Sequence, residues 1–147
     1  GEPQPTWLEF EVDFDTAEEF PELQFKYSII LKSGQTFKLA EGEVNHVDVG
    51  RGKDRHSVMY IGPKSLNKIS EGKPFTLQNI SACWVDIIVA GEPVGGAFKP
   101  FGGVTLDAVT KQKDKLDKIT DTLLNKTQTP FSPLYYDYYE AVKPTSR

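Results

Sequence analysis

From Leu8 to Phe14 the chain alternates strictly between apolar and acidic side chains, and this pattern constrains the fold more than any other part of the sequence. The apolar members are Leu8, Phe10, Val12 and Phe14, and the acidic ones are Glu9, Glu11 and Asp13. Successive side chains of a β-strand point to opposite faces of a sheet. The segment is therefore predicted to be a half-buried strand, and we interpret its carboxylates as the solvent side of that strand rather than as an acid and base pair.

The same alternation recurs along much of the chain. Further strands are predicted at Leu23–Ile29, at Thr36–Leu39 and Glu43–Val49 with an interruption at 40–42, at Ser57–Ile61 and within Phe75–Val89. Several short strands separated by turn residues are typical of a β-sandwich. We predict a mostly β fold in a single domain, residues 1–147, with an immunoglobulin-like sandwich as its architecture, although the chain lacks the cysteine pair of antibody domains.

The composition excludes several classes of protein. A chain of 147 residues with 38% hydrophobic content can bury one core without disulfides, and its single cysteine, Cys83, rules out a disulfide within the chain. The net charge of -4 argues against general nucleic-acid binding, which requires a concentrated cationic face. The apolar run Ile87–Ala90 is far shorter than the roughly 18 residues needed to span a bilayer.

The period of the pattern changes near the C-terminus. Apolar residues at helical spacing, among them Leu116 and Leu123, predict one amphipathic helix at about residues 110–125. Prolines prevent a helix from starting early in the segment 129–142, which is predicted to lie extended across the domain. Its aromatic residues are expected either to pack within the chain or to complete the sheet of a neighbouring subunit. They form a candidate assembly interface: Phe131, Tyr135, Tyr136, Tyr138 and Tyr139.

The two histidines are the natural candidates for acid and base chemistry near neutral pH. Neither His46 nor His56 has a cysteine or carboxylate partner at the spacing of a metal motif. We therefore expect surface or strand-edge histidines, no catalytic residue, no metal and no cofactor. The acidic residues at 13, 15, 18 and 19 suggest calcium, but they lack the glycine and final glutamate of an EF-hand loop. We interpret them as a solvated strand end.

A basic turn is the best candidate for a binding site. The glycines of Gly50–Gly52 would let backbone amides approach an anion, and four neighbouring cations would neutralise it: Arg51, Lys53, Arg55 and His56. The predicted order is strand, turn, strand, which excludes a phosphate loop that opens a helix. The turn is expected either to be an ordinary hairpin with exposed basic residues or to bind a sulfated or sialylated glycan.

Four stretches of the sequence resemble one known family. They are Phe10–Thr16, Pro21–Tyr27, Gly42–Gly52 and Thr129–Leu134, and they make the chain similar to the pilin-like proteins of Verrucomicrobia such as Akkermansia, which are encoded beside type IV pilus components. The resemblance implies an exported domain with an immunoglobulin-like fold at the cell surface, in the outer membrane or in the periplasm. Pilin-like proteins carry an apolar N-terminal helix, so membrane contact is expected only through a segment absent from this chain.

The resemblance also implies a non-enzymatic function in assembly, adhesion or host interaction. The expected partners are other pilus or surface proteins, a second copy of the chain, and a host glycan or receptor. The alternative is a carbohydrate-binding module that recognises mucin-type or anionic glycans through exposed aromatics or the basic turn. An enzyme would require His46 or His56 beside a carboxylate in a closed pocket, and we do not expect one.

Overall fold

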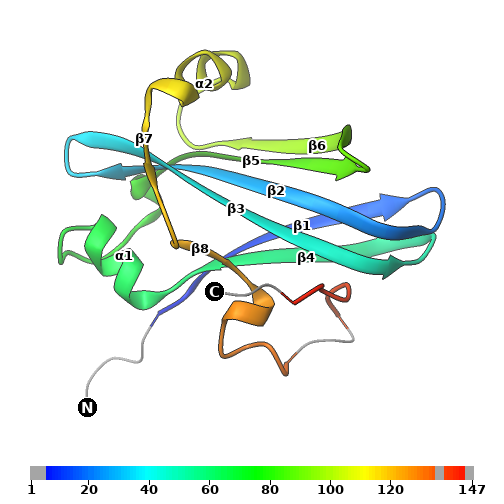
Figure 1. The fold of residues 1–147 in the computed structure, drawn as a ribbon. Coiled ribbons are helices and arrows are strands. Elements are labelled where there is room, and N and C mark those ends of the chain that lie inside the picture. Colours follow the sequence, from blue (N-terminus) through cyan, green and yellow to red (C-terminus); the bar gives the residue numbers. More distant parts are fainter. Residues whose placement is uncertain (1–5, 135–137, 145–147) are drawn as a thin grey trace.

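The computed structural model describes residues 6–134 and 138–144 and contains two β-sheets that pack face to face (Figure 1). The smaller sheet has the strand order β1-β4-β8, and the larger has the order β6-β5-β2-β3-β7. The prediction of a mostly β fold is confirmed. The strands are β1 (Leu8–Thr16), β2 (Phe20–Ser33), β3 (Thr36–Val49), β4 (Gly52–Ile61), β5 (Ile80–Val89), β6 (Glu92–Pro100), β7 (Asp117–Ile119) and β8 (Leu123–Asn125).

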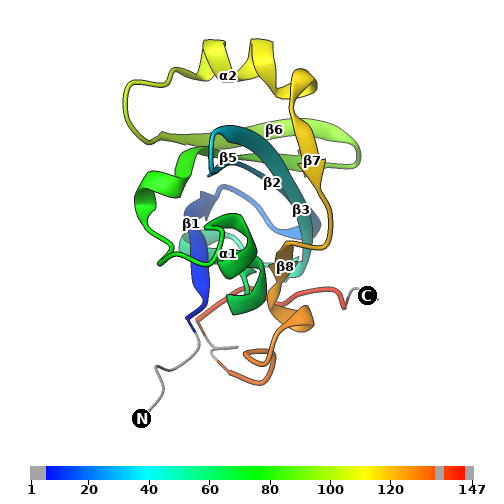
Figure 2. The same cartoon turned by 90° about the vertical axis from the view of Figure 1, so that its left-hand side faces the viewer.

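Two short helices cover the sheets. α1 (Pro63–Ile69) lies at one end of the space between the sheets and buries Leu66 and Ile69 there (Figure 2). α2 (Leu106–Gln112) lies over the outer face of the larger sheet (Figure 1), where its Val109 belongs to the same apolar cluster as Trp84. Single turns of 3-10 helix occupy Leu77–Asn79, Lys113–Lys115 and Lys126–Gln128.

The main core lies between the two sheets, and β2 contributes more of its buried side chains than any other strand. Phe25, Ile29 and Leu31 have no solvent exposure, and Met59 and Ile61 of β4 belong to the same cluster. Each such side chain contributes about 1.5 to 3 kcal/mol to folding when it is fully buried. β1 runs antiparallel to β4, and its apolar side chains also face this core but are only half-buried.

The predicted helix at residues 110–125 is wrong beyond its first turn. α2 begins after the cap Thr105, whose hydroxyl accepts a hydrogen bond from the Ala108 amide, and it ends at Gln112. The chain then forms β7, which pairs parallel with β3, and β8, which pairs antiparallel with β4. Side-chain pairs on a helix contribute only about 0.2 to 0.5 kcal/mol each. The stabilisation from pairing with open sheet edges and from burying Leu123 and Leu124 is larger than that from helical side-chain pairs.

The interruption predicted at residues 40–42 is also wrong, because β3 runs continuously from Thr36 to Val49. Gly42 is needed for close packing instead of a bend. A Cβ atom at this position would lie 2.7 Å from Met59 Cε and 2.9 Å from the backbone oxygen of Leu123. The glycine therefore lets β3 approach β8 and β4, which belong to the other sheet.

Replacing Gly42 with alanine is expected to lower the free energy of unfolding by about 2 kcal/mol, because overpacking of a tight contact costs about 1 to 3 kcal/mol. Met59 can move its terminal methyl group, but the backbone of Leu123 cannot move without disturbing β8. Urea unfolding measures the effect. Gly103→Ala is the matched control, since a Cβ atom there meets nothing within 4 Å. Equal stability of the two variants would contradict this packing.

The C-terminal segment closes one side of the sandwich. β7 pairs with the edge of β3 and β8 pairs with the edge of β4, on the side of the molecule away from β1 (Figure 2). Residues 140–143 continue along the same two edges. The Glu140 amide donates to His56 O of β4 at 3.1 Å, and the Lys143 amide donates to Asn45 O of β3 at 2.8 Å. The opposite side of the sandwich has no such cover in the described part of the chain.

The predicted extended tail at 129–142 is therefore right only for its last residues. The segment Thr129–Leu134 forms turns, with hydrogen bonds from the Ser132 amide to Thr129 O and from the Leu134 amide to Phe131 O. Proline favours such turns because its ring fixes the backbone angle that they require. Residues 135–137 lie outside the described residues.

Candidate functional site

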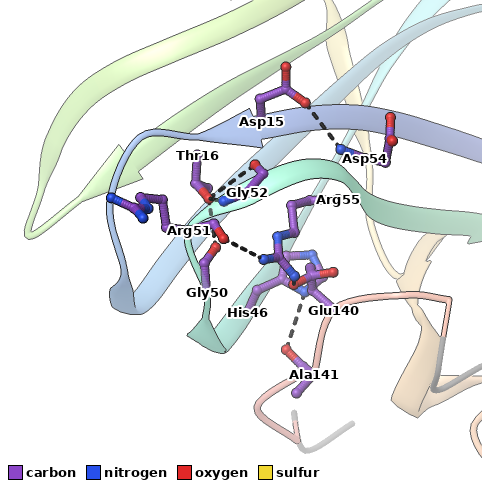
Figure 3. A network of polar contacts seen from close by, with 10 residues as sticks. All are labelled: Asp15, Thr16, His46, Gly50, Arg51, Gly52, Asp54, Arg55, Glu140 and Ala141. Atoms are coloured by element: carbon purple, nitrogen blue, oxygen red, sulfur yellow. Dashed lines mark hydrogen bonds and ion pairs between the residues drawn. The ribbon is translucent and has the colours of Figure 1, made fainter.

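The basic turn at Gly50–Gly52 joins β3 to β4 and forms hydrogen bonds with the end of β1 (Figure 3). Thr16 Oγ1 donates to Gly50 O at 2.6 Å and accepts from the Gly52 amide at 3.0 Å. Asp15 Oδ1 accepts from the Asp54 amide at 3.1 Å. The turn thus uses the amides of Gly52 and Asp54 within the protein, and these amides do not cradle an anion.

The four cations predicted for an anion site do not form one group. Arg55 Nη2 donates to Arg51 O at 3.0 Å, and Arg55 Nη1 lies 3.6 Å from Glu140 Oε1 (Figure 3). His56 comes next along β4, points to the opposite face and also contacts a carboxylate. Arg51 and Lys53 are exposed. The prediction of anion or glycan binding therefore rests on these last two residues.

His46 was expected at the surface or at a strand edge, and the surface position is wrong because only 1% of the residue is exposed. It lies in a buried chain of hydrogen bonds that crosses the core. Tyr27 Oη donates to Ser57 Oγ at 2.7 Å, Ser57 Oγ lies 2.8 Å from His46 Nε2, and His46 Nδ1 lies 3.3 Å from Ala141 O. The carbonyl of Ala141 can only accept, so His46 carries its proton on Nδ1 and accepts the Ser57 hydroxyl proton at Nε2.

This network stabilises the core and gives a substrate no access. Burial lowers the pKa of His46 to about 4, and burial also raises the pKa of Tyr27 above its ordinary value. Both groups are therefore neutral near pH 7, and every polar atom of the three-residue chain has a partner. A serine within hydrogen-bonding distance of a histidine resembles an activated nucleophile, but Ser57 has no solvent exposure.

A second cluster of side chains, which was not predicted from the sequence, lies on the outer face of the smaller sheet. His56 lies directly opposite Asp13 in the β1 and β4 pairing, and its Nδ1 atom is 2.7 Å from Asp13 Oδ1 and 3.8 Å from Glu11 Oε2. Alternation along β1 places Glu11 and Asp13 on one face. His56 joins them only through strand pairing, which residue spacing within one segment does not reveal.

The two carboxylates of this cluster have opposite pKa shifts. Burial and the neighbouring Asp13 carboxyl raise the pKa of Glu11, whereas hydrogen bonds from His56 and Glu11 lower the pKa of Asp13. The Asp13 side chain is 65% exposed, and the His56 side chain is 15% exposed. The cluster is therefore open to solvent on the Asp13 side and more enclosed at the imidazole.

Part of the predicted aromatic interface packs within the chain. The ring of Phe131 contacts those of Trp7 and Tyr60, with centroids 5.2 and 5.1 Å apart. Tyr139 is 9% exposed and belongs to the same outer cluster as Val58 and Tyr60. These two tail residues are thus unavailable to a neighbouring subunit in this conformation.

Tyr138 differs from its neighbour because it is 47% exposed. Its ring stacks on His56, with centroids 3.9 Å apart and an angle of 9° between the planes, and its hydroxyl donates to Glu11 Oε2 at 3.2 Å. An assembly function for Tyr138 stays a prediction. Tyr135 and Tyr136, the other members of the predicted interface, lie outside the described residues.

An open apolar cleft of about 400 Å³ separates β1 from β5 and β6. Half-buried side chains line it: Leu8, Phe10 and Val12 from β1, Cys83 from β5, Phe98 from β6, and Phe101. Within the described residues, β1 pairs only with β4 and β6 only with β5, so each strand is the edge of its sheet. The cleft therefore lies between two sheet edges, on the side that the C-terminal segment leaves open.

Comparisons with known proteins place the fold and the family. A crystal structure of a protein from Akkermansia muciniphila matches with a TM-score of 0.82 at 22% sequence identity, covering 98% of this chain and 81% of that chain. No curated protein has a significantly similar sequence. Among the described residues, no helix has the length and apolar character to cross a membrane. A family model matches residues 2–146, so the chain belongs to that family, which is a family of unknown function.

Proposed function

We propose that this chain is a non-enzymatic domain of a cell-surface or pilus-associated protein, and that it assembles by accepting an extended segment of a partner protein along β1. An immunoglobulin-like sandwich is part of this proposal, since such domains use exposed sheet edges and end loops for recognition. The similarity to pilin-like proteins supports the exported location. The observation that carries the proposal is the open apolar cleft beside the edge of β1.

The cleft and the edge together suit β-strand addition. An added strand forms main-chain hydrogen bonds with a sheet edge, while alternate side chains enter pockets beside it. In this chain β1 presents the edge, and the half-buried Leu8, Phe10 and Val12 present the apolar surface. A domain that left this surface uncovered would keep an exposed edge, which folded proteins usually protect.

The charges on β1 define the partner further. Its outward-facing residues are all acidic up to the bulge near Thr16: Glu9, Glu11, Asp13 and Asp15. A strand added beside β1 would place alternate side chains next to this row. Opposite charges on neighbouring strands are favourable and like charges are unfavourable. We therefore infer a partner segment that alternates apolar and basic residues.

The alternatives have less support. A hydrolytic site would need Ser57 and His46 to reach a substrate, and both are buried. A glycan-binding turn would need its cations to be available, yet Arg55 lies beside Glu140 and His56 lies beside Asp13. Arg51 and Lys53 are exposed, so a sulfated glycan is included in the test as a competing ligand.

A peptide-binding experiment tests the proposal. The probe is a labelled peptide that alternates valine and lysine and matches the nine residues of β1 in length, and fluorescence anisotropy measures its binding. We expect saturable binding that a peptide alternating valine and glutamate does not show. Alkylation of Cys83, which lines the cleft, should abolish binding. Because burial raises the pKa of this thiol, the alkylation is carried out at alkaline pH.

The matched control is the Cys83→Ser variant, which should keep its binding after the same alkylation treatment. Equal binding of the lysine and glutamate peptides, or binding that survives alkylation of Cys83, would overturn the strand-addition site. Tighter binding of a sulfated glycan than of the peptide would favour the carbohydrate-binding alternative. Antibody labelling of intact cells that produce the chain tests its location, and a purely cytosolic signal would contradict the surface assignment.

A further inference from the structure

Three side chains with metal-binding atoms converge on the outer face of the smaller sheet. Glu11 and Asp13 alternate on β1, and His56 faces Asp13 from β4. One ligand atom from each residue lies within 4.8 Å of the other two. Two neighbouring strands of one sheet supply all three residues, so the backbone that holds them is rigid compared with a loop.

The separations fit a small divalent ion. Zinc binds imidazole nitrogen and carboxylate oxygen at about 2.0 to 2.2 Å, so ligand atoms in a tetrahedral site lie about 3.3 Å apart. His56 Nδ1 lies 2.7 Å from Asp13 Oδ1 and 3.8 Å from Glu11 Oε2. These two distances bracket the required value. An ion would replace the proton shared by His56 and Asp13 and would move the side chains by about half an ångström.

Tyr138 holds two of the three residues in position. Its ring stacks on the imidazole of His56, and its hydroxyl donates to Glu11 Oε2 at 3.2 Å. Hydrogen bonds to a ligand from outside the coordination sphere commonly fix its orientation in metal sites. The Asp13 side chain is 65% exposed, so an ion and its bound water can enter from that side.

We propose that Glu11, Asp13 and His56 form a binding site for a borderline divalent metal ion such as Zn²⁺, with water completing the coordination. The imidazole selects against calcium and magnesium, which prefer oxygen ligands alone. The site holds two carboxylates against a single imidazole, and this excess of acidic groups favours a cation. This site lies on the outer face of the sheet and does not depend on strand addition at the cleft.

Isothermal titration with Zn²⁺ alone, on the whole chain, tests the site. We expect one ion to bind per chain and Ca²⁺ not to compete for it. His56→Gln and Asp13→Asn should each weaken binding by about tenfold or more, as loss of a ligand requires. In the wild-type chain, NMR should show the His56 ring resonances moving on addition of Zn²⁺ while those of the buried His46 stay in place.

Glu9→Gln is the matched control, because Glu9 lies on the same face of β1 but outside the trio. It should bind Zn²⁺ as the wild type does. Circular dichroism checks that each variant is folded. Absence of binding to the wild type would overturn the proposal. Equal binding by the wild type and His56→Gln would also overturn it, because it would mean that the ion binds elsewhere on the surface.

Discussion

Replacing Tyr139 with alanine is expected to lower the free energy of unfolding by about 3 kcal/mol, because truncating a buried aromatic side chain costs about 3 to 5 kcal/mol. Tyr139 is 9% exposed and packs with Val58 and Tyr60 on the outer face of β4. Its hydroxyl also hydrogen-bonds to Glu11. The substitution removes the main apolar contact that holds residues 138–143 against the smaller sheet.

Tyr138→Ala is the matched control, since the neighbouring ring is 47% exposed. Its stacking on His56 is worth about 0.5 to 1.5 kcal/mol, so the control should lose about 1.5 kcal/mol or less. Urea unfolding followed by tryptophan fluorescence measures both variants, and Trp7 lies in the same outer apolar cluster as Tyr139. Equal small losses would contradict packing of the tail within its own chain. Concentration-dependent stability would instead indicate exchange between subunits.

The predictions from sequence succeeded where residues close in the chain determine the structure. The alternation from Leu8 to Phe14 identified β1, because pleating alone decides which side chains share a face. The helix prediction at 110–125 used the same local information and failed. It could not include the open edges of β3 and β4, which β7 and β8 occupy. Those edges are formed by residues far away in the sequence.

The candidate site residues were also predicted only where neighbours in the sequence determine their positions. The spacing of Glu11 and Asp13 predicted one acidic face, and that face exists. Their partner His56 is 43 residues from Asp13 in the sequence, and only the register of β1 against β4 brings the two together. The interruption at 40–42 was predicted because a glycine beside an acidic residue suggests a bulge or bend, whereas the structure needs Gly42 for close contact with Met59 and Leu123.

Lowering the pH from 7 to 4 is expected to cost the protein about 3 kcal/mol through His46 alone. Burial lowers the pKa of this residue from 6.5 to about 4 in the folded state, while the unfolded chain keeps the ordinary value. Between these two values the unfolded state binds a proton that the folded state does not, so stability falls as the pH falls. Each pH unit in this window costs about 1.4 kcal/mol, and the effect levels off below pH 4.

The His46→Gln variant isolates this contribution, because a glutamine amide can still donate to Ala141 O and accept from Ser57 but does not titrate in this range. Acidification also lowers the stability of the protein through other groups, such as Asp13 with its lowered pKa. These groups are the same in the wild type and the variant. Urea unfolding across the pH range should therefore show a flatter profile for the variant between pH 6.5 and 4. The result would contradict a buried, neutral His46 if the two profiles were parallel, or if NMR showed the imidazole titrating near its ordinary pKa. A flatter profile would instead show that protonating His46 at Nε2 is opposed by burial of the new charge and by loss of the hydrogen bond that this atom accepts from Ser57.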